Sequence, residues 1–323
     1  MITLYLNIFL ITLLTLIFFS IYANKIHFLD QPIDRSSHIN PTPKSSGIIL
    51  CFIYSLAIYL VSENEIFLLL SLSIISLLGL IDDIYNLNAK IKLFIQFFTI
   101  TFIYIILINL EYPRIFENEL LNYFLFLIFS VYFINIFNFM DGIDALSIFQ
   151  SIYAILMLIL FSYLSEVELQ LNIEINIFIC ILLSQLILYF SKYKSFIGDS
   201  GSLYISLVIF VFYYLNKDIN LIIYLIAVFS FYIFDTSVTL FKRIINKDNI
   251  FKAHKEHFYQ LLAIKLNSHF KTNLIIILFN TLIVTPSLII FIYNRDYYLI
   301  VFIPFIVLLV IYNFAYNYVR KII

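Results

Sequence analysis

Long apolar runs separated by short polar stretches make up most of this chain of 323 residues. A helix crosses a bilayer with roughly 17–25 apolar residues, and many of the runs approach or reach that length. The apolar positions are continuous rather than alternating, so the pattern predicts helices and argues against the strands of a membrane barrel. We expect about eleven transmembrane helices, or ten, near residues 2–23, 47–61, 66–81, 93–110, 120–138, 145–164, 175–190, 202–215, 220–240, 274–293 and 298–315.

The polar stretches between the runs alternate in charge, which predicts the orientation of the chain. Loops after the odd-numbered runs and the C-terminal tail hold most of the 19 Lys and Arg, whereas the other side holds Arg114, Lys217 and Arg295. Because Lys and Arg collect in cytoplasmic loops, we expect the N-terminus outside and the C-terminus in the cytoplasm. The start MITLYLN lacks the positive segment of a signal peptide, so the first run is expected to be a true span.

Composition supports a membrane protein. Hydrophobic residues make up 63% of the chain and charged residues 12%, whereas a water-soluble domain has roughly 25% charged residues. The net charge of −1 argues against a nucleic-acid partner, and Cys51 and Cys180 lie inside apolar runs with no zinc or disulfide pattern. We therefore expect an all-α polytopic transmembrane helical bundle, a single membrane domain over residues 1–323 in contact with the lipid bilayer.

Polar residues gather in five clusters at the expected cytoplasmic ends of the helices. All five glycines lie within these clusters. A chain so poor in glycine keeps it where the backbone turns sharply or approaches a neighbour closely, so the clusters are candidates for a functional site. The five clusters are residues 34–47, 79–96, 135–147, 196–202 and 235–262.

Carboxylates dominate these clusters and indicate phosphate chemistry. The adjacent pair Asp82 and Asp83, together with Asp199, would be costly at the rim of a bilayer without a cation. Mg²⁺ prefers one or two carboxylates together with phosphate oxygens, and phosphoryl transfer needs such a metal beside cationic donors. The chain has no Walker A loop, which argues against an ATP-driven pump.

Spacing places several of these polar residues on shared helical faces. Asn135, Asn138 and Asp141 are three residues apart, and His254 and His257 are likewise expected to share a helical face. The other polar residues of this kind need no site to explain them. His27 and His269 are interpreted as residues of a cytoplasmic loop or of an ion pair between helices. Asp235 and Arg243, two helical turns apart, are interpreted as a structural pair.

A transporter or channel that uses the carboxylates as a cation path is the alternative function. Transporter sites usually lie near the midplane of the bilayer, in broken helices. Here the acids lie at one face, and the third, fifth and seventh runs are uninterrupted. This pattern favours surface chemistry on a membrane-bound substrate.

The five clusters together resemble the polyprenyl-phosphate N-acetylhexosamine-1-phosphate transferases, the family of the MraY, WecA and TagO enzymes. Order, spacing and sidedness agree over about residues 25–262, whereas the two terminal runs, 274–315, carry no motif. Ser46 and Ala145 stand where the family has glycine. The segments similar to family motifs are DRSSHINPTPKSSGI, IDDIYNLNAKIKLFIQ, NIFNFMDGIDALS and FIGDSGS.

The resemblance implies a reaction and its components. Undecaprenyl phosphate would attack the β-phosphorus of a UDP-N-acetylhexosamine, UMP would leave, and a polyprenyl-diphospho-sugar would form. The implied metal is Mg²⁺, with Mn²⁺ as an alternative, and a homodimer is compatible with the family. The implied location is the bacterial inner membrane, with the active site facing the cytoplasm.

The resemblance also assigns roles to residues. Asp199, Asp82 and Asp83 are candidate metal ligands and, with His254 and His257, candidate catalytic residues. Phe196 is a candidate for stacking on the uracil, and Asp144 for reading its edge. The full set of candidate substrate-binding residues is Arg35, His38, Lys44, Lys92, Asn135, Asn138, Asp141, Gly142, Asp144 and Phe196.

The fifth cluster indicates a branch of the family. It reads HKEHFYQLL, with Tyr259 and Gln260 where MraY and WecA enzymes have paired histidines. This resembles the short branch typified by WbpL, which begins O-antigen synthesis. The resemblance implies UDP-GlcNAc, or a 6-deoxy sugar such as UDP-FucNAc or UDP-QuiNAc, as the donor.

Overall fold

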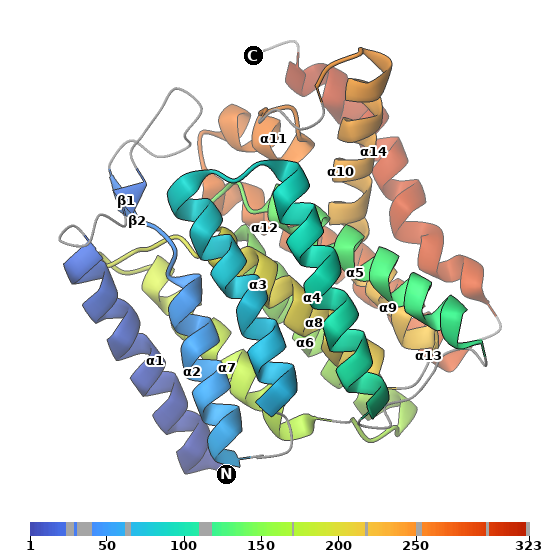
Figure 1. The fold of residues 1–323 in the computed structure, drawn as a ribbon. Helices are drawn as coiled ribbons and strands as arrows, with labels where there is room; N and C mark the ends of the chain where they lie inside the picture. Colours follow the sequence, from blue (N-terminus) through green and yellow to red (C-terminus); the bar gives the residue numbers. More distant parts are fainter. Residues whose placement is uncertain are drawn as a thin grey trace. The chain divides into compact units, whose positions relative to one another are not determined.

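The structure is a computed structural model, and it describes residues 1–23, 29–30, 41–61, 66–109, 118–169, 171–216, 219–249, 254–294 and 297–320. Two of the candidate substrate-binding residues, Arg35 and His38, lie outside the described residues. The described chain is helical apart from one short antiparallel pair of strands, β1 (Leu29–Asp30) and β2 (Thr42–Pro43) (Figure 1).

Each of the apolar runs coincides with a helix or with two consecutive helices. One further helix, the short α11, follows the fifth polar cluster. The helices are α1 (Ile2–Tyr22), α2 (Gly47–Val61), α3 (Ile66–Tyr85), α4 (Ala89–Asn109), α5 (Glu119–Met140), α6 (Leu146–Ser165), α7 (Asn172–Tyr189), α8 (Gly198–Leu215), α9 (Ile219–Val228), α10 (Ser230–Ile245), α11 (Phe258–Leu266), α12 (His269–Phe279), α13 (Thr285–Tyr293) and α14 (Ile303–Arg320), with a π-helix at Asn280–Val284 and a 3-10 helix at Tyr298–Phe302.

The helices confirm the expected all-α polytopic membrane protein. Within the described residues, 8 helices are long and apolar enough to cross a membrane, or 9 if the bent pair α9 and α10 forms one span. The runs at α2 and at the start of α14 form shorter apolar helices. The number of spans and the sidedness of the chain stay predictions.

The described chain forms two compact units. Unit 1 contains residues 1–141 and 170–217, and unit 2 contains residues 142–169 and 218–323. The motif-bearing clusters are divided between the units, because the segment NIFNFMDGIDALS crosses the boundary after Asp141. The expectation that the whole chain acts as a single domain stays a prediction.

Helix α8 is the centre of unit 1. Every residue of α8 is buried except Asp199, at its first turn. Helices α2, α3 and α5 pack against it. Gly79 allows α3 to pack closely against α8, because a Cβ at this position would overlap the backbone of Asp199 and Ser200. This close packing brings the C-terminal end of α3 to the N-terminal end of α8.

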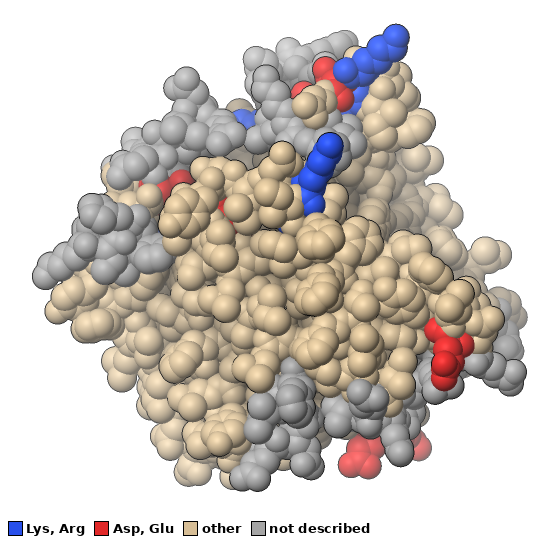
Figure 2. Space-filling view, viewed as in Figure 1, with Lys and Arg blue, Asp and Glu red and all other residues tan. Residues whose placement is uncertain are grey.

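The outer face of unit 1 fits a lipid environment. Phe94 and Phe98 of α4 and Leu70 of α3 are exposed. Figure 2 shows that the visible surface over the middle of α3 and α4 carries no charged side chain. Because exposed apolar side chains of this density are unfavourable in water, this face is consistent with contact to lipid.

Unit 2 contains two helix irregularities joined by buried polar side chains. Helices α9 and α10 meet at a bend of 68° after Val228, and a π-helix begins at Asn280. The Gln150 amide donates to the Val228 carbonyl at 2.8 Å and accepts from the Asn280 amide at 2.8 Å. Since backbone groups in a bilayer need internal partners, this network stabilises the bend.

Candidate active site

The N-terminal turn of α8 is held by the loop that precedes α2. The amides of Ser46 and Gly47 donate to the carbonyls of Phe196 and Ile197 at 3.1 and 3.0 Å, and the Phe196 amide donates to the Pro43 carbonyl at 2.8 Å. Gly198 has φ +67°, which favours glycine, and a Cβ there would overlap the Asp83 carboxylate. The first and fourth polar clusters therefore form one backbone-bonded structure.

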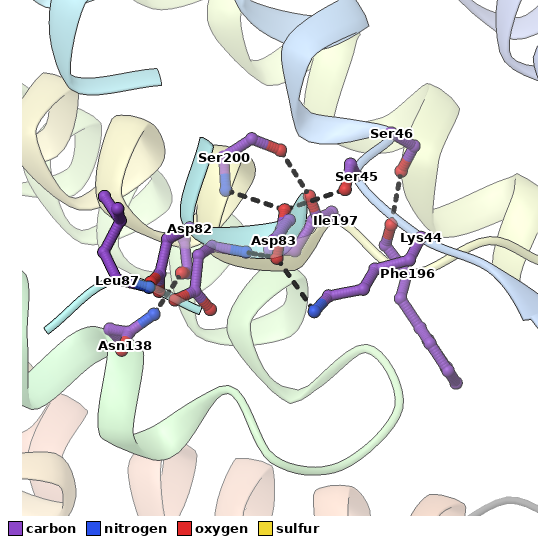
Figure 3. Close-up of polar contacts among 12 residues, drawn as sticks. Lys44, Ser45, Ser46, Asp82, Asp83, Leu87, Asn138, Phe196, Ile197 and Ser200 are labelled. Carbon is purple, nitrogen blue, oxygen red and sulfur yellow. Dashed lines mark hydrogen bonds and ion pairs between the residues drawn. The ribbon is translucent and has the colours of Figure 1, made fainter. Parts of the chain in front are cut away.

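Asp83 is the anchor of this structure. Its side chain is 1% exposed. It accepts hydrogen bonds from the Asp199 amide at 3.0 Å, the Ser200 amide at 3.3 Å and the Ser45 hydroxyl at 2.8 Å, and it pairs with Lys44 at 3.0 Å (Figure 3). Two of these donors are first-turn amides of α8, so Asp83 caps that helix from α3. Both of its oxygens are occupied by protein donors.

Lys44 stays a cation in this environment. Burial works to lower the pKa of its ammonium group, but the carboxylates of Asp83 and Asp199 outweigh this effect, and the pKa is raised. Its side chain is 30% exposed, so the charge remains accessible from one side. A permanent cation of this kind suits the binding of phosphate oxygens.

A second group of charges joins α3, α4 and α8. The Lys92 ammonium forms ion pairs with Asp82 Oδ2 and, at 3.4 Å, with Asp199 Oδ2. The Leu87 amide donates to Asp82 Oδ1 at 2.7 Å and holds this carboxylate in place. Asp82 and Asp199 therefore face the same cation from two helices.

The amide side chains of the third cluster lie on α5. Asn138 donates to the Ser202 hydroxyl of α8 at 2.8 Å, one turn beyond Asp199. Asn135 donates to Gln96 Oε1 at 2.8 Å and to the Val131 carbonyl at 2.7 Å. Asn138 therefore lies close to the carboxylates, whereas Asn135 joins α5 to α4 through its bond to Gln96.

Phe196 has a different environment from the carboxylates. Its side chain points away from Asp83 (Figure 3). The Lys194 ammonium lies over its ring, 5.3 Å from the centroid. The expected stacking of Phe196 on a base stays a prediction.

The remaining candidates lie in unit 2. The carboxylate of Asp144 lies 3.0 Å from Nδ1 of His269, at the start of α12. This contact agrees with the interpretation of His269 as a residue of a loop or of an ion pair between helices. A Cβ at Gly142 would overlap the Tyr259 hydroxyl, so this glycine allows the tyrosine that distinguishes the fifth cluster to approach the DGID segment.

The fifth cluster also differs from the predicted helix. His254 lies in a non-helical segment before α11, and His257 is the N-cap of α11, so the two do not share a helical face. Their rings nevertheless stack, with centroids 5.0 Å apart. Burial, together with His257 and Arg243, lowers the pKa of His254 to about 4. Its Nδ1 accepts from the Glu256 amide at 3.4 Å. His254 is therefore a neutral imidazole at pH 7.

Asp235 and Arg243 stabilise this region without pairing with each other. Asp235 accepts from the amides of Phe258 and Tyr259 at 2.8 and 3.0 Å and caps α11. Arg243 donates to the Asn249 carbonyl at 2.7 Å and pairs with Glu256 at 3.0 Å. The predicted structural role is confirmed for both residues. The predicted pair is wrong, because Asp235 bonds the first amides of α11, whereas Arg243 bonds Asn249 and Glu256.

The sequence analysis missed several residues that support the candidates. Ser45 and Ser202 were not singled out, although both lie beside residues of recognised motifs. Asn273 of α12 donates to the Asp144 carbonyl at 2.8 Å, from a region without motifs. Serine and asparagine are common in loops, so only their position near a carboxylate could have revealed them.

The carboxylates fit Mg²⁺ in part. Asp82 and Asp199 present oxygens to one shared cation, and Mg²⁺ takes one or two carboxylates together with phosphate oxygens. Among the described residues, no three His, Cys, Asp or Glu side chains are grouped closely enough to hold a metal by themselves. The geometry favours Asp82 and Asp199 over Asp83, whose oxygens accept from four protein donors.

The fold and the carboxylate–lysine cluster define an integral membrane protein with a charged site at the ends of apolar helices. Residues 65–217 match the family model described as Glycosyl transferase family 4. A probable undecaprenyl-phosphate N-acetylglucosaminyl 1-phosphate transferase of Bacillus subtilis is 28% identical over 271 residues, 79% of this chain and 75% of the relative.

Two further relatives extend this result. An undecaprenyl-phosphate alpha-N-acetylglucosaminyl 1-phosphate transferase of Thermotoga maritima is 26% identical and covers 81% of each chain. A phospho-N-acetylmuramoyl-pentapeptide-transferase of Dictyoglomus thermophilum is 28% identical over 60% of this chain and 66% of its own. The chain is thus similar to polyprenyl-phosphate N-acetylhexosamine-1-phosphate transferases, and its apolar helices make it a multi-pass membrane protein.

Proposed function

We propose that this enzyme transfers N-acetylhexosamine 1-phosphate from a UDP-sugar to undecaprenyl phosphate. The observation that carries the proposal is the Lys92 ammonium held between Asp82 and Asp199, beside the ion pair of Lys44 and Asp83, in a chain similar to this family. Fixed cations and carboxylates at the end of apolar helices suit a phosphorylated lipid and a soluble diphosphate.

The proposed reaction exchanges one phosphoanhydride bond for another. An oxygen of undecaprenyl phosphate forms a bond to the β-phosphorus of the donor, and the bond from that phosphorus to the bridging oxygen breaks. UMP leaves with the electron pair of that bond. The anomeric bond of the sugar is not cut, so the sugar keeps its configuration.

The residues near α8 contribute binding and orientation. Lys44 and Lys92 are placed to hold phosphate oxygens by charge, and Asn138 to donate to the diphosphate. Magnesium, when bound, neutralises diphosphate charge, and Asp82 and Asp199 would hold it. A phosphate dianion is nucleophilic without a base. The rate of transfer in this proposal therefore depends mainly on how the two substrates are positioned.

Asp141 of unit 1 and several residues of unit 2 supply recognition of the donor. Asp144 and Gly142 read the uracil in this proposal, and Asp141, at the end of α5, binds near the diphosphate. His254 donates one hydrogen bond as a neutral imidazole, and His257 supports it through ring stacking. Tyr259 and Gln260 favour the WbpL-like branch and a UDP-GlcNAc, UDP-FucNAc or UDP-QuiNAc donor.

The proposed cellular role is the first membrane step of O-antigen or another surface polysaccharide. It places the enzyme in the bacterial inner membrane, with its active site facing the cytoplasm. These assignments rest on the resemblance of the fifth cluster to the WbpL-like branch. The best donor identified in the assay below tests them directly.

The test is an assay on the purified protein with undecaprenyl phosphate, Mg²⁺ and a panel of UDP-N-acetylhexosamines. We expect UMP and a lipid-linked sugar in equal amounts, and loss of both when EDTA removes the metal. No UMP from any donor, with EDTA making no difference, would reject the transferase and favour the cation path.

A pair of matched variants sharpens the assay. Lys92→Gln removes the cation that Asp82 and Asp199 share, and we expect turnover to fall by about 10²-fold or more. Lys90→Gln changes an exposed lysine on the same helix and is expected to leave turnover within about twofold. Equal loss in both variants would contradict the role of Lys92.

A further inference from the structure

Side chains of helix α12 contact both the main chain and the side chain of Asp144. His269 Nδ1 lies 3.0 Å from Asp144 Oδ2 and 3.3 Å from the Asp144 amide. The Asn273 amide, one turn further along α12, donates to the Asp144 carbonyl at 2.8 Å. Both polar groups of the Asp144 main chain therefore lie within hydrogen-bonding distance of side chains of α12.

Nδ1 of His269 makes one of these two hydrogen bonds at a time, depending on whether it carries a proton. With a proton on Nδ1, the ring donates to the Asp144 carboxylate. Without it, the same nitrogen accepts from the Asp144 amide. His269 and Asp144 are 15% and 10% exposed in their side chains, so water competes weakly with this contact.

The segment that α12 holds is under backbone strain. Ala145 follows Asp144 directly and has φ +60°, a left-handed conformation that is unfavourable for a residue with a Cβ. Such a conformation persists only when surrounding contacts determine it. His269 and Asn273 are those contacts on the N-terminal side of Ala145.

Asn273 adds a second unusual feature. Its side chain is 1% exposed, and its Oδ1 atom has no hydrogen-bond partner among the described residues. A buried acceptor without a partner is unfavourable. The hydrogen bond from Asn273 to the Asp144 carbonyl is therefore made at the expense of an unpaired buried oxygen. Such an arrangement is expected where the position of the backbone matters.

We propose that His269 and Asn273 are positioning residues that orient Asp144 to receive the imide N–H of a uracil nucleotide. This inference rests on the proposed function, in which Asp144 reads the base. It assigns a role in donor recognition to α12, which lies outside the recognised motifs. His269 acts through Asp144 and does not itself contact the nucleotide.

The experiment measures UMP binding by isothermal titration calorimetry on the purified, full-length protein. His269→Ala removes the bond to the carboxylate, and we expect the Kd of UMP to rise by about tenfold, typical of one charge-assisted hydrogen bond. In His269→Asn the side-chain amide occupies the position of Nδ1, and we expect it to restore binding to within about threefold. Lys271→Ala, on the exposed face of α12, is the matched control and is expected to bind as the wild type does.

A double variant separates positioning from a structural role. Once Asp144→Asn has removed the carboxylate, adding His269→Ala is expected to cause little further loss of UMP affinity. In turnover, His269→Ala should raise KM for the UDP-sugar with KM for undecaprenyl phosphate and kcat unchanged. If His269→Ala does not fold, His269→Gln takes its place, because its amide lies at the position of Nε2 and cannot replace Nδ1.

The outcomes distinguish this inference from the proposed function. UMP binding that depends on His269, with no transfer from any donor, would reject the transferase and leave the inference intact. UMP affinity unchanged in His269→Ala, additive losses in the double variant, or no UMP binding by the wild type would each overturn the inference.

Discussion

Asp82 and Asp83 are adjacent in the chain but have different environments. Asp83 is saturated by a lysine, a serine and two helix amides, whereas Asp82 shares the Lys92 ammonium with Asp199. Neighbouring positions on a helix point about 100° apart, so one carboxylate faces α8 and the other faces α4. We infer a positioning role for Asp83 and a more direct role for Asp82.

Substitution of Asp83 should therefore cost stability. Asp83→Asn leaves the half-buried Lys44 without its main counter-ion and weakens the cap of α8, and we expect the free energy of unfolding to fall by about 2 kcal/mol. Thermal unfolding followed by circular dichroism in detergent measures this. Asp248→Asn, an exposed aspartate in unit 2, is the control. Equal melting temperatures for both variants would disprove the anchoring role.

His254 should make stability depend on pH. Its pKa is about 4 in the folded protein, below the ordinary value of 6.5, so the unfolded chain takes up a proton first as the pH falls. Stability is thus lost progressively from about pH 6.5 towards pH 4. In His254→Gln the decrease in melting temperature between pH 7.5 and pH 5 should be smaller. An identical decrease in wild type and variant would contradict the lowered pKa.

Ala145 offers a stabilising substitution. Ala145→Gly relieves the left-handed strain at φ +60° and should raise the free energy of unfolding by about 1 kcal/mol. Ala145 is the N-cap of α6. Ala154→Gly, in the interior of α6, should lower the free energy of unfolding by at least about 1 kcal/mol. Chemical denaturation of the two variants compares them, and a loss of stability in Ala145→Gly would show that the strain is absent.

At the scale of the elements, carboxylates from other helices organise two helix N-termini. Asp83 of α3 caps α8, and Asp235 of α10 caps α11, each by accepting from two consecutive first-turn amides. The amides at a helix N-terminus lack partners within the helix and carry a partial positive charge. Each cap fixes the start of a helix that begins beside a polar cluster.

The contact between α3 and α8 depends on a residue with no side chain. Gly79→Ala places a methyl group against the backbone of Asp199 and Ser200, so α3 must move away from α8. We expect a loss of about 1–3 kcal/mol in stability and a marked decrease in turnover. Leu77→Ala, on the exposed face of α3, is the control, because it alters α3 without altering its contact with α8. Wild-type turnover in Gly79→Ala would show that the spacing of these helices is not critical.

At the scale of the whole molecule, the charge pattern makes a testable prediction of orientation. Lys90 lies in the first turn of α4 and is expected in the cytoplasm, whereas Asn118, the N-cap of α5, is expected outside. With both native cysteines replaced by serine, a membrane-impermeant maleimide should label Asn118→Cys in spheroplasts. It should label Lys90→Cys only after permeabilisation. The reverse result would invert the orientation.

Much of the architecture can be predicted from the sequence, because each membrane helix corresponds to a continuous apolar run. An apolar run must form its own backbone hydrogen bonds in a bilayer, so its length and position predict a helix. Each predicted run contains a helix in the structure. The bend between α9 and α10 and the π-helix at Asn280 were not predicted, because they depend on the buried partner Gln150 in another helix.

The sequence by itself determined the class of membrane protein and predicted the family resemblance and the candidate residues. Motif residues are close together in the chain, so their spacing carries the signal. Only the tertiary structure decided which carboxylate anchors and which shares a cation, and that His269 holds Asp144 from 125 residues away. Such pairings have no local pattern, because they arise when glycine-mediated packing and helix caps bring distant side chains together.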